Sequence, residues 1–540
     1  LTKPVSRREV KLQGQMGSQD TTQYMLRYAD RFWERLGISF AYQRTQTGGY
    51  SVGRILQTAT AVTSPAGLVI AAPRRTQTAT GGVTYELGEQ GNNWYNHHSY
   101  RVKADTSLGS RTSLSGQYMY RDYRYGYDGT TSYATDASGA QLFRGNVFFN
   151  EASQWRRVAL NPSSFVPGSG VGNAHFGNGT LLHSFQEIGS LRLAAGQSYS
   201  PVDYFTTSAS GTPANGAGGP GTLADRPNRS TYAEAQYTAP KLGRHFVLAG
   251  NEMRLFSTQA YNDEVTDIAF PTNVLRRSVY SAGKSLNNGL YLQDQFSLGE
   301  RLHITAGTRF DYWRNYQGAS IDRPDVPVNT YPTRSASYLS AKGAAVYRLR
   351  EGSIARLSLA NAFRAPNLVD LYRTTFSAQT QVLSLPNPNL LPEKMWTIEA
   401  GFRQRLAGDI QAEVSAYQNQ ITDLMYRVTD FTLDPTGRTS VVTNVGKART
   451  RGLEVASEQR AAGFLRLRQS YTFTNAIITS NPGAPATVGR RVALVPRSVA
   501  TFQAFLNHKR WNAVLSGRYL GKMFTNDTNR SEEHTSELQS

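Results

Sequence analysis

The residues best suited to bind a small molecule are aromatic and basic side chains that gather in a few segments in or near expected loops. Guanidinium groups bind anions and stack on aromatic rings, and tyrosine and tryptophan add flat stacking surfaces. Such residues are therefore candidates for contacts with an anionic or aromatic ligand. The candidate ligand-binding residues are Arg121, Tyr123, Arg124, Tyr125, Tyr127, Trp155, Arg156, Arg157, Tyr372 and Arg373.

No group of residues has the spacing of a catalytic or metal-binding site. The chain contains 8 histidines, and no pair has the HExxH spacing that holds zinc. His97 and His98 are adjacent, and we expect them at a solvated loop edge rather than in a metal site. The absence of cysteine excludes disulfides, Cys-based zinc sites and thiol catalysis. We therefore expect no enzyme activity, no metal site and no cofactor.

Two glycine-rich stretches are expected to be loops. Residues 167–179, PGSGVGNAHFGNG, superficially resemble a phosphate-binding loop but lack its GK[ST] ending and a following helix. We expect this stretch to be a flexible external loop. Residues 210–222, SGTPANGAGGPGT, have the low complexity of a loop tip.

The elements that position the candidates show a hydrophobic period of two. Leu290 and Leu292 alternate with polar residues, and the same pattern returns after the turn LGER in Leu302, Ile304 and Phe310. Two such runs joined by a tight turn predict a β-hairpin. Its apolar face would point into a core in a soluble sandwich, but toward lipid in a membrane barrel.

The composition favours the barrel. The mean hydropathy is −0.46, aromatic residues make up 11%, and no stretch approaches the roughly 18 consecutive apolar residues of a spanning helix. A lipid-spanning barrel combines low hydropathy with many aromatic residues, because only alternate residues face lipid.

The connections between the predicted strands alternate between short and long. Short turns such as LGSR, LGER and NHKR each precede a longer connection one strand later, and the longest expected loop covers residues 126–228. An up-and-down antiparallel β-barrel with short periplasmic turns and long external loops has this rhythm. The expected strands, about seventeen, cover residues 9–17, 22–31, 36–45, 98–108, 112–125, 230–238, 245–257, 279–298, 302–313, 337–349, 353–362, 394–406, 410–425, 440–458, 464–477, 497–507 and 511–522.

Charged residues on the polar face support a wet interior. Arg466 and Arg468 alternate with Leu465 and Leu467, and two arginines would be costly in a dry core. The same alternation places aromatic residues at strand ends, where a membrane barrel carries girdles. The expected girdle residues are Tyr118, Tyr120, Tyr312 and Trp313. Aromatic strand ends also occur in soluble sheets. The candidate ligand-binding residues could equally be girdle, lumen or lipopolysaccharide contacts.

Four motifs in the second half of the chain carry a family resemblance. They are NNGLYLQDQFSLGERLHITAGTRFDYW (residues 287–313), LANAFRAPNLVDLY (359–372), PNPNLLPEKMWTIEAGF (386–402) and NVGKARTRGLEV (444–455). In this order they resemble the barrel of TonB-dependent outer-membrane receptors, with Asp370 where the family more often has glutamate. The motif residues, which we expect to be mainly structural, are Phe363, Arg364, Pro366, Asn389, Pro392, Glu393, Asn444, Gly446, Gly452 and Glu454.

The resemblance implies a barrel of about twenty-two strands closed by an N-terminal plug. We expect residues 1–8 to be the end of a plug, residues 9–529 a partial barrel of about seventeen strands that does not close alone, and residues 530–540, RSEEHTSELQS, a translated sequencing adapter. The partial barrel would lie in the outer membrane of a Gram-negative bacterium.

The function implied by the resemblance is uptake of a scarce nutrient, foremost a ferric siderophore. Expected partners are the TonB-ExbB-ExbD complex, lipopolysaccharide, outer-membrane lipid and a small nutrient ligand. The net charge is +19, but lysine and arginine are spread along the chain, so we expect no nucleic-acid partner. The alternatives are a passive porin and, from another class, a surface-exposed all-β glycan-binding adhesin.

Overall fold

The chain is built almost entirely from β-strands. The computed structural model describes residues 5, 7–51, 53–77, 82–209, 218–322, 325–377, 382–406, 409–429, 433–435, 438–524, 529 and 532–539, and only the backbone of residues 376, 377, 382, 429 and 532–539. No helix in these ranges is long and apolar enough to cross a membrane. Of residues 1–8, the expected end of a plug, residues 1–4 and 6 lie outside the described residues.

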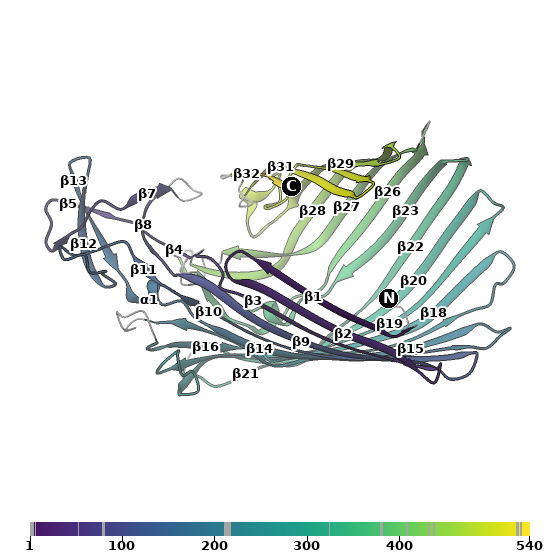
Figure 1. Cartoon of the computed structure of the whole chain (residues 1–540), viewed down its shortest axis with the longest axis horizontal. Helices are drawn as coiled ribbons and strands as arrows, with labels where there is room; N and C mark the ends of the chain where they lie inside the picture. The colour runs from purple at the N-terminus through teal and green to yellow at the C-terminus, as the bar shows by residue number, and fades with distance from the viewer. Residues whose placement is uncertain are drawn as a thin grey trace.

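The long strands form one sheet in which each strand pairs antiparallel with the next long strand in the chain (Figure 1). In pairing order they are β1 (Glu9–Gly17), β2 (Thr21–Phe32), β3 (Leu36–Thr47), β9 (Asn92–Ser107), β10 (Thr112–Asp128), β14 (Gly170–Ser184), β15 (Ser190–Ser208), β17 (Asn228–Thr238), β18 (His245–Val265), β19 (Val274–Leu298), β20 (Leu302–Ile321), β22 (Arg334–Arg350), β23 (Ser353–Arg364), β26 (Glu393–Arg405), β27 (Ile410–Thr429), β28 (Thr439–Ala462), β29 (Leu465–Ser480), β30 (Ser498–His508) and β31 (Trp511–Phe524). This order confirms the predicted up-and-down topology.

Short elements lie at the ends of the long strands. They are β16 (Gly221–Asp225), β21 (Asn329–Tyr331), β24 (Thr375–Ser377), β25 (Val382–Leu385), α2 (Leu368–Tyr372) and the 3-10 turn η1 (Pro485–Thr487). All of them belong to the longer connections, at the same end of the sheet. The opposite end carries tight turns, as the rhythm of the sequence predicts.

The sheet curls around but does not close (Figure 1). Within the described residues β1 pairs only with β2, and β31 pairs with β30 and with β32 (Glu532–Gln539). The backbone of β32 continues the sheet, and the adapter origin expected for residues 530–540 stays a prediction.

The two faces of the sheet differ in polarity, as the predicted hairpin requires. Leu290 pairs with Phe310, and these side chains are 56% and 48% exposed on one face. Tyr291 and Arg309, their neighbours in sequence, pair on the other face. In a membrane barrel the apolar face meets lipid and the polar face lines the lumen. We call them the outer face and the inner face.

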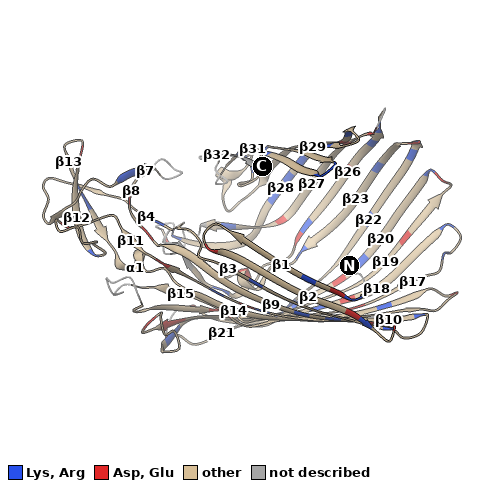
Figure 2. Ribbon diagram, in the orientation of Figure 1, with Lys and Arg blue, Asp and Glu red and all other residues tan. Residues whose placement is uncertain are grey.

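The inner face carries the charges that the sequence places there. Arg468 Nε lies 2.8 Å from Glu458 Oε2, and Arg466 lies 4.7 Å from the centroid of the Phe505 ring. Figure 2 shows lysine, arginine and acidic residues distributed along many long strands, without one dominant basic stripe. The arginines of β29 are therefore paired within a polar wall.

The long loop expected at residues 126–228 is wrong, because two long strands lie within it. β14 pairs with β10 and β15, and β15 pairs with β17. The glycine-rich residues 167–179, expected to be a flexible loop, contribute most of their length to β14. Glycine and asparagine are rare in strands and hide the alternation of apolar residues, so local sequence gives no strand signal here.

Three side chains lie elsewhere than expected. His97 and His98 are inside β9 rather than at a loop edge, with His97 on the inner face and His98 on the outer face. Trp313 is not a girdle residue: it is on the inner face and is 0% exposed beneath α2. Tyr118 and Tyr312 are exposed on the outer face, as expected for a girdle.

A separate small unit, which we call the loop module, forms from the connections after β3 and β10. Its strands are β4 (Arg54–Gln57), β5 (Thr60–Val62), β6 (Leu68–Val69), β7 (Arg74–Gln77), β8 (Val83–Glu89), β11 (Thr131–Ser132), β12 (Gly145–Glu151) and β13 (Gln154–Leu160), followed by α1 (Pro162–Phe165). Two small sheets enclose a core that includes Tyr85, Leu87 and Phe149. The module projects beyond the ends of the long strands (Figure 1).

Candidate functional site

The candidate residues of β10 divide between the two faces of the sheet. Arg121, Tyr123, Tyr125 and Tyr127 share the inner face, because they alternate with the outer-face positions of β10 without a register shift. Arg124 lies on the outer face by the same parity. The inner-face residues can therefore act together, and Arg124 cannot join them.

Glycines on β14 make room for two of these tyrosines. A Cβ at position 172 would lie 2.5 Å from the Tyr123 ring, and one at position 170 would overlap the Tyr125 ring. Both rings can therefore lie flat across the backbone of β14. This close approach explains Gly170 and Gly172 in the stretch that resembled a phosphate-binding loop.

The flat arrangement brings Tyr123 to β15. Its hydroxyl donates a hydrogen bond to Asp203 Oδ1 at 2.7 Å, across the intervening strand β14. Asp203 in turn accepts a hydrogen bond from the backbone N–H of Arg226 at its carbonyl oxygen, at 3.1 Å. Side chains from β10 and β15 and the residue that follows β16 thus meet at one place.

The aromatic surface continues onto β9. The ring centroids of Tyr123 and Tyr125 are 6.5 Å apart with an interplanar angle of 13°, and those of Tyr95 and His97 are 6.0 Å apart at 16°. Tyr95 and Tyr123 are 6.4 Å apart and link the two pairs. The four rings form a continuous aromatic wall on the inner face.

The segment that contains Tyr372 and Arg373 reaches the same face from β23. Asn367 caps α2, accepting a hydrogen bond from the backbone N–H of Asp370 at 2.8 Å. Tyr372 is 1% exposed and stacks on Tyr331, with centroids 5.4 Å apart. Tyr372 therefore anchors this loop, and Arg373, the next residue, is held over the inner face.

Arg373 and Arg226 lie near each other although they are far apart in the sequence. Burial, and secondly the positive charge of Arg226, lower the pKa of Arg373 to about 10. Burial also lowers the pKa of Arg226, although the charge of Asp203 opposes that effect. Arginine stays protonated at neutral pH, so two like charges lie within electrostatic range of each other.

The Arg226 side chain packs on an aromatic ring, but no ion pair neutralises its charge in the described chain. Its guanidinium carbon lies 4.5 Å from the centroid of the Phe205 ring, and its Nε is buried without a hydrogen-bond partner in the described chain. Sequence reasoning missed Tyr95, His97 and Arg226. His97 was assigned to a loop edge, Tyr95 lay before the strand expected at residues 98–108, and Arg226 lay in the supposed long loop. Only the strand register brings them to Tyr123. We call this group the inner-face cluster: Tyr95, His97, Arg121, Tyr123, Tyr125, Arg226 and Arg373.

The remaining ligand candidates are in the loop module. Arg156 Nε lies 2.7 Å from Glu151 Oε2, and its guanidinium is 6.0 Å from the Tyr85 ring. Trp155 and Arg157 flank it on β13. These three residues belong to the small sheets of the module, so the structure does not bring them together with the inner-face cluster.

Glu393, from the family motif, fastens the loop that carries Tyr372. It is 6% exposed, and it accepts hydrogen bonds from Arg364 Nε at 2.6 Å and from the backbone N–H of Met425 at 2.7 Å. Neighbouring strands β23, β26 and β27 are thus joined at one carboxylate. Pro366 and Pro392 lie outside the strands at either end of this loop.

Asn444 and Asn389 hold the other side of the same loop. Asn444 Nδ2 donates to Leu391 O at 2.7 Å and to Asp423 O at 2.9 Å, and Asn389 accepts from Arg334. These contacts give the asparagines a structural role.

The other motif residues lie along the strands. Phe363 stacks on Tyr338 at 4.5 Å. Gly446 pairs with Leu424 at a register shift in the β27–β28 ladder, and Gly452 leaves room for the Tyr417 ring. Glu454 is an exposed inner-face residue.

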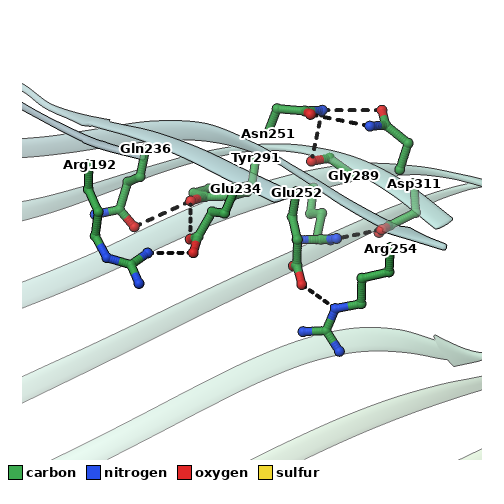
Figure 3. Close-up of polar contacts among 11 residues, drawn as sticks. Arg192, Glu234, Gln236, Asn251, Glu252, Arg254, Gly289, Tyr291 and Asp311 are labelled. Atoms are coloured by element: carbon green, nitrogen blue, oxygen red, sulfur yellow. Dashed lines mark hydrogen bonds and ion pairs between the residues drawn. The ribbon is translucent and has the colours of Figure 1, made fainter. Parts of the chain in front are cut away.

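Below the cluster, the inner face carries a network of ion pairs and hydrogen bonds (Figure 3). The Tyr291 hydroxyl donates to Glu234 at 3.1 Å, and Glu234 also pairs with Arg192. Arg309 lies 2.8 Å from Asp311 and 3.1 Å from Glu252. The charges of this part of the inner face are therefore neutralised by one another, whereas Arg226 and Arg373 have no such ion pairs in the described residues.

Metal ligands are not grouped in the described residues, where no set of three or more His, Cys, Asp or Glu side chains could hold an ion. The inner-face cluster can instead bind an anionic group through its arginines and a flat group through its rings.

Comparison with known proteins places these features in a family context. The family model described as "TonB dependent receptor-like, beta-barrel" matches residues 171–536. A hemin receptor of Yersinia pestis is 27% identical over 228 residues, which cover 39% of this chain and 30% of that protein. The chain thus spans less than a third of the length of that curated relative.

Solved structures share the fold at low sequence identity. The ferric yersiniabactin uptake receptor of Yersinia pestis has a TM-score of 0.65 and 14% identity, covering 99% of this chain and 72% of that one. The siderophore receptor PiuA of Acinetobacter baumannii has a TM-score of 0.66 and 14% identity, covering 99% and 74%.

Proposed function

Because this chain belongs to the TonB-dependent receptor-like β-barrel family, we propose that it forms the barrel of a receptor that imports an iron chelate across the outer membrane. The family is one of transport receptors and not of enzymes. The outer membrane of a Gram-negative bacterium is its location, and the exposed leucines of the outer face fit that location.

The observation that carries the proposal is the position of the inner-face cluster. Tyr123 and Tyr125 lie near the end of β10 that leads into the loop module, Arg226 is in the connection after β16, and Arg373 is in the connection after α2. All three connections belong to the end with long loops, which faces the outside in an outer-membrane barrel. A nutrient arriving from outside would meet arginines and aromatic rings first.

The proposed uptake has two stages. The ligand binds to the inner-face cluster between the long connections, and a plug that fills the lumen then moves when the TonB-ExbB-ExbD complex pulls on it. The polar inner wall of Figure 3 would contact the plug, and lipopolysaccharide and lipid would contact the outer face. These partners are proposals drawn from the family.

The test is energy-dependent uptake by cells. The gene that encodes this chain is deleted, and uptake of iron-55 is measured from hemin, from a ferric trishydroxamate and from a ferric catecholate. We expect uptake of at least one chelate to fall to background on deletion, and also when a protonophore is added to wild-type cells. Uptake that persists with the protonophore and extends to neutral sugars would indicate a passive porin and contradict the proposal.

A further inference from the structure

The outer face of the sheet contains a cavity of about 440 Å³ near the strand ends that carry the long connections. Small residues line part of it, among them Ser257, Ala282 and Ala319. Next to them the β19–β20 ladder has a register shift, and Gln317 of β20 has a positive φ of 53°. A bulge of this kind bends a strand locally, so the small side chains and the bulge together leave space in the outer face. We call this cavity the outer-face pocket.

The strand register places two cations in the outer-face pocket. Lys284 is an even number of residues from Leu290 along β19, with no register shift between them, so both lie on the outer face. Lys284 pairs with Ser257 of β18, and Ser257 pairs with Arg229 of β17. Paired residues share a face of the sheet. Lys284 and Arg229 therefore both line the pocket from the outer face.

A third cation lies beside the pocket. Arg314 has its guanidinium carbon 5.3 Å from the centroid of the Tyr316 ring, and Tyr316 pairs with Lys284. In the same way, the guanidinium carbon of Arg229 lies 4.5 Å from the centroid of the Tyr199 ring. Stacking on a ring orients a guanidinium group and leaves its N–H groups free to donate. Both arginines can therefore donate hydrogen bonds to a ligand.

These three cations are not neutralised by the protein. In the described residues Arg229, Lys284 and Arg314 make no ion pair, whereas Arg192 and Arg309 on the inner face contact carboxylates. No aspartate or glutamate is among the described residues that line the pocket. The pocket thus has a net positive charge, which favours an anionic occupant.

The position of the pocket along the strands indicates which part of the membrane it meets. On the outer face of β20, Phe310 is followed by Tyr312 and then by Arg314 toward the long connections, and on β19 Leu286 is followed by Lys284. Apolar residues thus give way to an aromatic residue and then to cations. Aromatic girdles lie at the membrane–water interface, so the cations lie at the level of the lipid headgroups on the external side.

Phosphate is the anion that suits this level and these side chains. Arginine and lysine bind phosphate oxygens through charge-assisted hydrogen bonds. Cavities of several hundred Å³ hold small-molecule groups, so a phosphorylated sugar fits the volume. Lipopolysaccharide in the external leaflet of the outer membrane carries such a phosphorylated sugar, lipid A, with acyl chains attached to it.

We propose that the outer-face pocket binds the phosphorylated sugar of lipopolysaccharide, with a phosphate on Arg229, Lys284 and Arg314 and the acyl chains on Leu286 and Leu290. This inference rests on the lipopolysaccharide contact in the proposed function and gives that contact a site. A phospholipid headgroup or free phosphate would offer the same anion without the phosphorylated sugar and its chains. The experiments therefore compare these sources.

The first experiment measures binding of lipid A to the intact receptor that contains this chain, purified in mild detergent and freed of native lipid. Native mass spectrometry counts the bound lipid during a titration. We expect the double variant Arg229→Gln and Lys284→Gln to weaken lipid A binding about tenfold. The double variant Arg244→Gln and Arg301→Gln is the charge-matched control, because these residues lie in short turns at the opposite end of the sheet.

The control should bind lipid A like the wild type. Equal losses in the two double variants would show general attraction of a basic protein for an anionic lipid, and no loss in either would show that the pocket is not the site. Both results would overturn the proposal. The charge-retaining variant Arg229→Lys and Lys284→Arg should keep most of the affinity, and its failure to do so would contradict a site that depends on charge.

The second experiment varies the ligand. Lipid A from which the phosphates have been removed should bind the wild type about tenfold more weakly, and the double variant Arg229→Gln and Lys284→Gln should no longer distinguish the two forms. Phosphatidylglycerol should bind the wild type more weakly than lipid A. Equal binding of phosphatidylglycerol would assign the site to any anionic lipid, and displacement of lipid A by millimolar inorganic phosphate would assign it to free phosphate; both would overturn the proposal.

The uptake assay separates failure of this inference from failure of the proposed function. If cells import an iron chelate through the receptor but lipid A binding does not depend on Arg229 and Lys284, the pocket assignment is wrong and the receptor function stands. If lipid A binds as expected but no chelate is imported, the uptake function fails and the outer-face pocket remains a lipid site.

Discussion

Tyr123 and Asp203 are joined by a 2.7 Å hydrogen bond that crosses the strand lying between them. The bond forms because position 172 on β14 is glycine, so that the tyrosine ring can lie flat on the backbone. It connects β10 with β15 through side chains, in addition to the backbone ladder. The same arrangement fixes the aromatic wall in place, which links the packing of the sheet to the candidate site.

Replacement of Gly172 by alanine tests whether the flat packing of the Tyr123 ring on β14 stabilises the protein. The new Cβ would lie 2.5 Å from the Tyr123 ring, so the ring must move and its hydrogen bond to Asp203 must break. We expect a loss of about 1–3 kcal/mol in the free energy of unfolding, measured by thermal denaturation in detergent.

Gly177→Ala on the same strand is the matched control. A Cβ at position 177 would meet its nearest neighbour, the Tyr118 ring, at an ordinary 3.8 Å. Its stability should remain within about 0.5 kcal/mol of the wild type. Equal destabilisation by the two substitutions would show that the packing of Tyr123 on Gly172 makes no particular contribution to stability.

Glu393→Ala should loosen the loop between β23 and β26. The substitution removes the acceptor for Arg364 and leaves the backbone N–H of Met425 without a partner, at a cost of about 1–3 kcal/mol. Limited proteolysis should then cut the loop at residues 365–392 faster than in the wild type. Glu454→Ala is the control, because Glu454 is an exposed residue of the inner face. Cleavage at the same rate in both variants would argue that the contacts of Glu393 do not hold the loop.

Anion binding at Arg373 should depend on pH only at high pH. Burial, and secondly the positive charge of Arg226, lower its pKa to about 10 in the folded chain. The group is almost fully charged below pH 9, so its contribution to the affinity for an anionic ligand should be nearly constant there and should fall as the pH rises through about 10. A lowered pKa of a base also means that the folded state regains stability as the pH rises above about 10 toward the higher pKa of the unfolded chain.

Arg373→Gln is the control for this titration. The variant lacks the titrating group, so its weaker affinity should show a smaller fall around pH 10, measured by titration with an anionic fluorescent probe. If the wild type and the variant lose affinity in parallel as the pH rises, another group controls binding.

The fold was predictable where apolar residues alternate and turns are tight. The hairpin of Leu290 and Phe310 is one example, and the polar inner position of Arg468 is another. β14 was not predictable from local sequence, because its residues suit contacts with β10. Gly170 and Gly172 leave room for tyrosine rings of β10, and His175 forms a hydrogen bond with the Tyr118 hydroxyl. Trp313 was misplaced at a girdle although its parity with Phe310 already puts it on the inner face.

The candidate site was predictable only in part. Tyr123, Tyr125 and Arg373 were chosen by residue type; the structure places the two tyrosines side by side and Arg373 within electrostatic range of Arg226. His97 joins them because β9 pairs with β10, and Arg226 because β14, β15 and β16 follow β10 in the sheet. Pairing between strands that are distant in sequence is not encoded by any short motif, so these two residues needed the structure.

The most direct test of a two-faced membrane barrel is the reactivity of single cysteines, since the chain contains no natural cysteine. Leu292→Cys is on the outer face and Gln293→Cys on the inner face of β19. In isolated outer membranes, a water-soluble maleimide should label Gln293→Cys and leave Leu292→Cys unlabelled until detergent is added. Rapid labelling of Leu292→Cys with protection of Gln293→Cys would contradict a lipid-facing outer face and a lumen lined by the inner-face cluster.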